Sequence, residues 1–128
     1  MKKEIKTDSA PNAIGTYSQA IMSIGVKTIY LSGQIPLLPS TMEMINNNID
    51  DQIKQVFENL NSVCIASGGG LNDIVKLNVY LTDLSNFSKV NKIMEHYFDA
   101  PFPARAAVGI KELPREALVE MDAVMVIN

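Results

Sequence analysis

The sequence has no tryptophan and holds only one cysteine, Cys64, and one histidine, His96. A single cysteine cannot form a disulfide within the chain, and one histidine with one cysteine cannot build a zinc site of the usual kind. No apolar run approaches the ~20 residues that a membrane-spanning helix needs. The chain begins with Met-Lys-Lys and continues with charged residues, not with the apolar segment of a signal peptide. We therefore expect a cytoplasmic protein that needs no metal.

Basic residues are in the minority, because the formal net charge is -3 and the pI is about 5.0. Nucleic-acid-binding proteins normally carry a basic patch or stripe, so we expect no nucleic-acid partner, and no membrane partner either. Phosphate-binding glycine motifs are also missing. The triplet Gly68-Gly69-Gly70 is not followed by the Lys-Ser/Thr of a P-loop and lacks the spacing of a dinucleotide fingerprint. It predicts a helix C-cap and a turn instead.

The 128 residues, 47% of them hydrophobic, suit a single domain over residues 1–128. Alternating apolar residues predict strands over residues 2–6, 17–23, 26–32 and 74–81, and the second and third are expected to form a hairpin. Apolar residues at helical spacing predict a helix that begins after Asn48 and ends at the glycine triplet. A second helix is predicted to start within residues 83–86 and to end at Pro101.

Two more strands are predicted after Pro103 and over residues 118–127, again as a hairpin. The expected order is therefore β-β-β-α-β-α-β-β. This order indicates an α+β fold, with a mainly antiparallel mixed sheet of about six strands and two helices on one face. Antiparallel pairing in the closing hairpin would bring Arg105 near Glu120 or Asp122.

The sheet face away from the helices is expected to be less apolar than a buried core. Such a face is either solvated or buried against another subunit, and a symmetric oligomer is the usual outcome. The residues predicted for this face are Thr28, Tyr30, Ser32, Arg105, Glu120 and Asp122.

Arg105 is the first candidate for chemistry, because a guanidinium can grip a carboxylate with two parallel hydrogen bonds. The alternative is a structural ion pair with Glu120 or Asp122. Glu120 is the second candidate, since a carboxylate beside a small-molecule site can orient or deprotonate water. Its alternative is a solvated strand residue or the partner of Arg105. Asp122 offers the same chemistry as Glu120, and the spacing does not choose between them.

Four further positions are candidates for the site. The Tyr17 hydroxyl could bind a substrate, or the ring could pack in a core or interface with the hydroxyl at the rim. Ser32 and Gly33 could offer a hydroxyl and close backbone approach, or only a strand-ending turn. Asn91 borders the apolar stripe of the second helix, where its amide needs a partner: either a ligand or an interface contact.

Five blocks of the sequence have a familiar combination of residues. They are Ala13-Ile14-Gly15-Thr16-Tyr17-Ser18-Gln19-Ala20, Tyr30-Leu31-Ser32-Gly33-Gln34-Ile35-Pro36, Val79-Tyr80-Leu81-Thr82-Asp83-Leu84, Phe87 through Val90-Asn91, and Phe102-Pro103-Ala104-Arg105-Ala106-Ala107 with Val119-Glu120. Together these blocks resemble the RidA/YjgF family of enamine/imine deaminases. The similarity runs from about residue 7 to the end, in the order of the family.

The resemblance implies a chorismate-mutase-like α+β fold and a homotrimer with three sites at the subunit clefts. It implies hydrolysis of reactive enamine and imine acids, such as 2-aminoacrylate and 2-iminobutyrate, to 2-oxo acids and ammonia. Pyridoxal-phosphate enzymes release these compounds, so the resemblance implies a functional link to such enzymes and a role in metabolite damage control. It implies no cofactor for the deaminase itself.

Carried over by position, the resemblance implies that Arg105 binds the substrate carboxylate and that Glu120 positions the attacking water. It also implies that Tyr17 forms a hydrogen bond at the reacting end of the substrate. Further pocket positions match Ser32, Gly33, Asn91 and Ala107.

Two positions depart from the family pattern. Ala107 stands where several members have cysteine, which argues against a thiol role but leaves a backbone contact with the ligand. Thr16 stands where proline is common, and we expect it to loosen the approach to Tyr17.

Two other functions compete with the deaminase. The first is a binding module that senses a small carboxylate through Arg105 without turning it over. The second is an RNA- or translation-related role, against which the acidic pI argues. Glu120 distinguishes the deaminase from the binding module, because a pure binder has no use for a carboxylate beside bound water.

Overall fold

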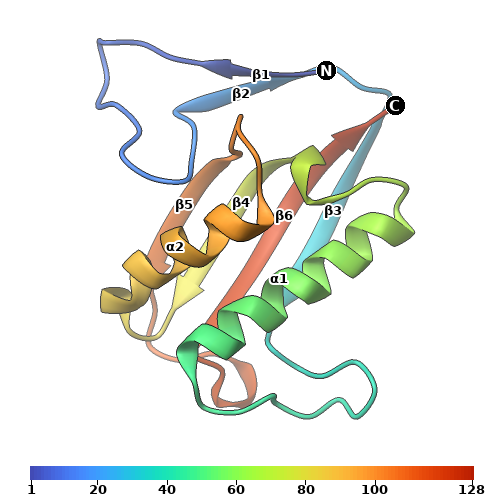
Figure 1. Cartoon of the computed structure of the whole chain (residues 1–128), viewed down its shortest axis with the longest axis vertical. Coiled ribbons are helices and arrows are strands. Elements are labelled where there is room, and N and C mark those ends of the chain that lie inside the picture. The colour runs from blue at the N-terminus through green and yellow to red at the C-terminus, as the bar shows by residue number, and fades with distance from the viewer.

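Six strands and two α-helices follow one another in the order that the sequence predicts (Figure 1). The computed structural model describes residues 1–128. The strands are β1 (Lys2–Ile5), β2 (Ala20–Ser23), β3 (Lys27–Gln34), β4 (Ile74–Leu81), β5 (Ala104–Gly109) and β6 (Val119–Ile127), and the α-helices are α1 (Ile49–Ala66) and α2 (Phe87–Tyr97). Short 3-10 helices lie at Leu71–Asp73, Leu84–Asn86 and Pro114–Glu116. Neither α-helix has the length and hydropathy to cross a membrane.

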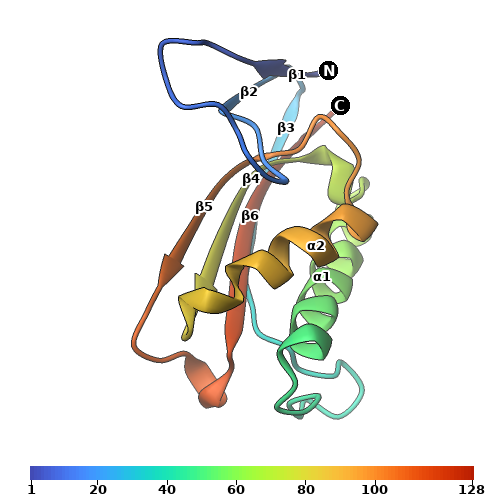
Figure 2. The same ribbon diagram turned by 60° about the vertical axis from the view of Figure 1, so that its left-hand side comes forward.

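Both α-helices cover the same face of a four-stranded sheet with the strand order β3-β6-β4-β5 (Figures 1 and 2). The prediction of an α+β fold with two helices on one face is confirmed. The strands do not form one continuous sheet, however, because β1 and β2 pair only with each other in a separate two-stranded sheet. This small sheet lies at one end of the larger one, beside the chain termini (Figure 1).

The predicted hairpin of residues 17–23 and 26–32 is wrong, because its two strands belong to different sheets. β2 pairs antiparallel with β1, whereas β3 pairs antiparallel with β6. Gly25, between β2 and β3, packs against the end of β6, and a Cβ there would lie only 2.7 Å from the Ile127 carbonyl oxygen. The missing side chain thus lets the chain pass from one sheet to the other.

The predicted closing hairpin is also wrong, because β4 lies between β5 and β6. β5 runs parallel to β4, and α2 forms the crossover connection that parallel pairing requires. β6 runs antiparallel along the other side of β4. β4 suits this central position because its sequence is apolar and its alternate residues Leu77, Val79 and Leu81 are fully buried.

The strand pairing also changes the face on which Arg105 lies. Arg105 stands opposite Leu77, and facing residues in a sheet point to the same side, so Arg105 lies on the helix-covered face. Its predicted position on the open face is therefore wrong. The other residues predicted for the open face do lie there: Thr28, Tyr30, Ser32, Glu120 and Asp122.

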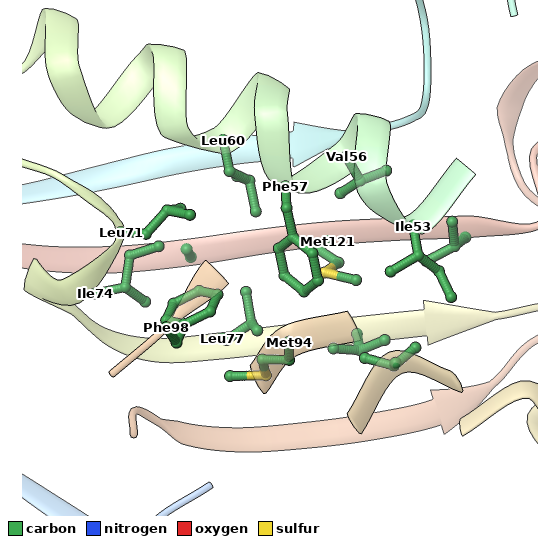
Figure 3. Packing of buried hydrophobic residues seen from close by; sticks show 14 of the residues in the cluster. Ile53, Val56, Phe57, Leu60, Leu71, Ile74, Leu77, Met94, Phe98 and Met121 are labelled. Carbon is green, nitrogen blue, oxygen red and sulfur yellow. The ribbon is translucent and has the colours of Figure 1, made fainter. Parts of the chain in front are cut away.

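The buried apolar faces of α1 and α2 form the core that holds both helices on the sheet. The side chain of Asn48 caps α1 by accepting the backbone N–H of Asp51 at 3.0 Å, and Gly68, with φ +97°, follows its end. Phe57 of α1 packs edge-on against Phe98 after α2 (Figure 3). The buried apolar residues of α1 are Ile53, Val56, Phe57, Leu60 and Cys64. This packing fixes α2 beside β5, where Arg105 lies.

Candidate functional site

A pocket of about 580 Å³ opens beside Arg105, at the β5 edge of the sheet. Its walls come from the loop between β1 and β2, the 3-10 helix at Leu84–Asn86, α2 and β5. Four of the predicted site residues line it together: Tyr17, Asn91, Arg105 and Ala107. Much of the remaining wall is formed by three apolar side chains that were not predicted for the site: Ile14, Leu84 and Phe87.

The Arg105 guanidinium is held from three sides. Its Nη1 donates to the Thr16 hydroxyl at 3.0 Å and to the Thr16 carbonyl at 3.3 Å. Its Cζ lies 5.1 Å from the centre of the Tyr17 ring and 4.8 Å from the centre of the Phe87 ring. Contacts of a cation with aromatic faces stabilise it by about 0.5–2 kcal/mol each. The guanidinium is therefore fixed in place without a carboxylate.

The predicted ion pair of Arg105 with Glu120 or Asp122 is absent. The one ion pair in the chain joins Lys6 to Glu4 at the surface. Desolvation lowers the pKa of Arg105 to about 10, while the nearby Tyr17 opposes this shift. The side chain thus stays charged at neutral pH. A partly buried cation with no internal counter-charge favours an anionic ligand.

Tyr17 lies in a loop between two fixed neighbours, not at the head of a strand as predicted. Ser18, which is buried, donates its backbone N–H to the Pro103 carbonyl at 3.0 Å and its hydroxyl to the Phe102 carbonyl at 2.5 Å. On the other side Thr16 is buried and hydrogen-bonded. These contacts bind the loop to the start of β5 and hold the Tyr17 ring against Arg105.

Thr16 does not loosen the approach to Tyr17, contrary to our expectation. Its side chain is buried, and its hydroxyl donates to Asn91 Oδ1 at 3.0 Å while it accepts from Arg105. Asn91, on α2, therefore has a partner within the chain. Thr16 could not be predicted as a polar contact of the pocket, because neither periodicity nor charge pattern marks a lone threonine in a loop.

The remaining predicted site residues, Ser32, Gly33 and Glu120, gather on the open face of the sheet. The register of β3 against β6 shifts between Leu31 and Gln34, so Ser32 and Gly33 form an irregularity beside β6. Glu120 packs against Gly33, where an added Cβ would lie 2.7 Å from Glu120 Oε2. Glu120 forms no hydrogen bond or ion pair within the chain, so its carboxylate is free to bind water or a ligand.

Asp122 is distinguished from Glu120 by its partners. It accepts hydrogen bonds from Asn78 Nδ2 and from the Tyr80 hydroxyl, both at 2.7 Å. The bond to Asp122 raises the pKa of Tyr80, because the carboxylate favours the protonated phenol. Asp122 thus has a structural role on the open face. Glu120 is the carboxylate that remains available to bind water or a ligand.

The two groups of site residues cannot meet within one chain. Arg105 on β5 and Glu120 on β6 are separated by β4, which corresponds to about 10 Å between their backbones. They also point to opposite faces of the sheet. One chain therefore presents the pocket beside the Arg105 cation on one face of the sheet and the Glu120 carboxylate on the other.

Comparison with known proteins gives a consistent result over the whole chain. The family model described as endoribonuclease L-PSP matches residues 7–127. A protein from Dermatophagoides farinae named 2-iminobutanoate/2-iminopropanoate deaminase is 43% identical, over 99% of this chain and 98% of the relative. The crystal structure of RidA from an Antarctic Psychrobacter species is 46% identical, covers 98% of this chain and 99% of that chain, and has a TM-score of 0.77. The structure of TdcF from E. coli with bound serine is 35% identical, over 98% and 99%, with a TM-score of 0.75.

Proposed function

Because this chain belongs to the RidA/YjgF family, we propose that it hydrolyses 2-enamine and 2-imine acids of the 2-aminoacrylate and 2-iminobutyrate type to 2-oxo acids and ammonia. Its relatives identify the chain as an enzyme of the 2-iminobutanoate/2-iminopropanoate deaminase type. We further propose that it acts in the cytoplasm on compounds that pyridoxal-phosphate enzymes release. The substrate range and the roles of individual residues are proposals from the site.

The observation that carries this proposal is the position of the Arg105 guanidinium. It faces a pocket of about 580 Å³, which suits a small molecule, and it has no carboxylate partner in the chain. A 2-imino acid supplies that carboxylate. The solved relative TdcF binds serine, which also carries one. The apolar wall formed by Leu84 and Phe87 suits the short aliphatic side chain of 2-iminobutyrate.

We propose that the site is completed by a second copy in a homotrimer. Arg105 and Glu120 face opposite sides of the sheet, so a carboxylate and a guanidinium can meet only across a subunit cleft. The open face also exposes a large side chain on each of its edge strands, since Tyr30 of β3 is 79% exposed and Val108 of β5 is 45% exposed. Exposed apolar side chains on a sheet face are typical of an interface. In the trimer, the Glu120–Gly33 side of one subunit would approach the Arg105 pocket of the next.

The proposed reaction needs little assistance, because C2 of a 2-imino acid is already electrophilic. Arg105 binds the carboxylate and fixes C2 in the pocket. Glu120 accepts one proton from a water molecule whose oxygen adds to C2, and the imine nitrogen takes up one proton from solvent, which gives a tetrahedral carbinolamine. Glu120 then passes its proton to the amino nitrogen, the hydroxyl loses its proton to solvent, and the C–N bond breaks, so that ammonia leaves as the C2 carbonyl forms. Tyr17 is proposed to donate a hydrogen bond at the reacting end.

The pocket beside Arg105 also supports a second candidate, a regulatory module that binds a small carboxylate without turnover. The observation in its favour is that one chain supplies all the residues that line this pocket, whereas Glu120 lies on the other face of the sheet. We propose no RNA-related role, because a net charge of -3 does not favour an RNA partner.

A coupled assay tests the deaminase proposal. A threonine dehydratase generates 2-iminobutyrate in the cuvette, and the release of 2-oxobutyrate is followed with and without this protein. We expect acceleration beyond spontaneous hydrolysis. Tight binding of 2-oxobutyrate with no acceleration, by a folded protein, would support the carboxylate-binding module instead.

Gly33→Ala is expected to lower kcat by about tenfold to a hundredfold, because displacement of a reacting group by about 1 Å has effects of this size. The new Cβ would lie 2.7 Å from Oε2 and 3.0 Å from Cδ of Glu120 and would push the carboxylate aside. The displaced atoms are the flexible end of a side chain, so the fold should tolerate the change. Gly70→Ala is the matched control, since an added Cβ there meets nothing within 4 Å. Equal kcat values for the two variants would contradict the role of Glu120.

A further inference from the structure

Thr16 links the two polar groups of the pocket. It is only 4% exposed, and its hydroxyl lies between Arg105 Nη1 and Asn91 Oδ1, at 3.0 Å from each. The Thr16 carbonyl lies 3.3 Å from the same Nη1. Both acceptors that Thr16 can offer are therefore directed at one nitrogen of the guanidinium.

We propose that Thr16 is a positioning residue that sets the rotation of the Arg105 guanidinium and the orientation of the Asn91 amide, so that their unpaired N–H groups face the ligand. This inference rests on the proposed function for the identity of the ligand. The positioning itself rests on the contacts within the chain. It concerns a residue that touches neither the carboxylate nor the reacting carbon in the proposed mechanism.

The aromatic neighbours of Arg105 cannot set this rotation by themselves. Tyr17 and Phe87 lie within 5.1 Å and 4.8 Å of Cζ and restrict where the guanidinium lies. The attraction of a cation to a ring face depends weakly on how the planar group turns about its own centre. The hydrogen bonds to Thr16 supply that direction, together with a longer and weaker contact of Nη1 with Met94 Sδ at 3.6 Å. They occupy Nη1, and leave the N–H groups of Nε and Nη2 as the two-pronged fork for a carboxylate.

The same hydroxyl determines how the Asn91 amide is turned. An arginine can only donate, so the hydroxyl accepts from Arg105 and gives its single proton to Asn91, where Oδ1 at 3.0 Å is nearer than the backbone carbonyl at 3.5 Å. The Nδ2 group of Asn91 is then left as an unpaired donor at the pocket wall. Gly15 allows this close packing, since an added Cβ there would lie 3.1 Å from Oδ1. Thr16 therefore aligns the donors of two side chains through one hydroxyl.

Proline, which the family resemblance leads us to expect at this position, has no hydroxyl. A chain with proline could keep the carbonyl contact to Nη1 but not the link to Asn91. The arrangement of donors in this pocket is thus a property of this chain, and it predicts a preference for ligands in which a second acceptor accompanies the carboxylate.

The test compares Thr16→Val, which keeps the side-chain shape without the hydroxyl, with Thr16→Ser, which keeps the hydroxyl. Titration with 2-oxobutyrate gives Kd, and the coupled assay gives KM and kcat. We expect Thr16→Val to raise Kd and KM about tenfold, the effect of losing one hydrogen bond to a charged group, while kcat changes less than about twofold. Thr16→Ser should restore binding. Thr41→Val, in an exposed loop, is the matched control. Thr16→Ala repeats the comparison if the valine variant fails to fold.

Nitrogen NMR of the Arg105 side chain provides a readout that does not depend on activity. We expect separate Nη signals in the wild type and averaged signals in Thr16→Val, because the fixed rotation is lost. Unchanged signals and an unchanged Kd in Thr16→Val would overturn the inference. Equal loss of binding in Thr16→Val and Thr16→Ser would assign the effect to packing and also overturn it. Averaged signals in Thr16→Val, with a wild type that neither binds nor deaminates, would uphold the positioning and contradict the proposed function.

Discussion

Arg105→Ala is expected to lower kcat/KM by about one to two powers of ten, because a charge-assisted hydrogen bond to a carboxylate contributes about 1.5–3 kcal/mol. The variant should remain folded. Arg105 is only partly buried, it forms no ion pair, and its hydrogen bonds to Thr16 end in a loop. The coupled assay measures the activity, and the thermal midpoint of unfolding checks the fold.

Two further substitutions make the Arg105 experiment specific. Arg105→Lys keeps the positive charge, but an ammonium cannot form the planar fork, so we expect little recovery of kcat/KM. Arg115→Ala removes the same charge from the exposed 3-10 helix Pro114–Glu116, where Arg115 donates only to the Met42 carbonyl, and should leave activity unchanged. A folded Arg105→Ala variant with wild-type kcat/KM would exclude Arg105 as the carboxylate-binding residue.

Glu120→Gln is expected to lower kcat by about 10²- to 10⁴-fold, the usual contribution of a general base, while the Kd for 2-oxobutyrate changes little. The amide has the shape of the carboxylate but cannot accept the proton of the attacking water. Glu120 forms no hydrogen bond within the chain, so the substitution should not destabilise the fold. Stopped-flow or steady-state assays give kcat, and calorimetry gives Kd.

Asp122→Asn is the matched control for Glu120, because it makes the same chemical change two residues further along β6. Asp122 already accepts from Asn78 and Tyr80, so its loss should lower the stability of the open face while kcat changes much less. If Asp122→Asn abolished turnover and Glu120→Gln did not, the assignment of the base would be reversed.

The helices could be predicted because their signals are local. Asn48 caps α1 and the glycine triplet follows its end, as the sequence indicates, and Phe57 lies in the predicted apolar stripe. The pairing of the strands, in contrast, depends on contacts between segments that are far apart in the sequence. Sequence order favours a hairpin between neighbouring strands, but α2 carries β5 back to the far side of β4.

The wrong pairing had one consequence for the site. Because side chains alternate along a strand, the partner of β5 decides on which face Arg105 lies, and the true pairing opposite Leu77 turns it to the helices. The identity of the site residues followed from the family resemblance, but their division between two faces did not. Thr16 could not be recognised either, since its role depends on contacts with Asn91 and Arg105, both more than 70 positions away in the sequence.

The central claim is that Arg105 of one subunit and Glu120 of another act on the same molecule. Co-assembly of Arg105→Ala chains with Glu120→Gln chains tests it most directly. Each variant alone should be nearly inactive. In randomly mixed trimers, about three quarters would contain both variants and one intact site out of three, so about a quarter of wild-type activity should return. Activity that stays at the level of the separate variants, with mixed trimers verified by mass spectrometry, would contradict the shared site.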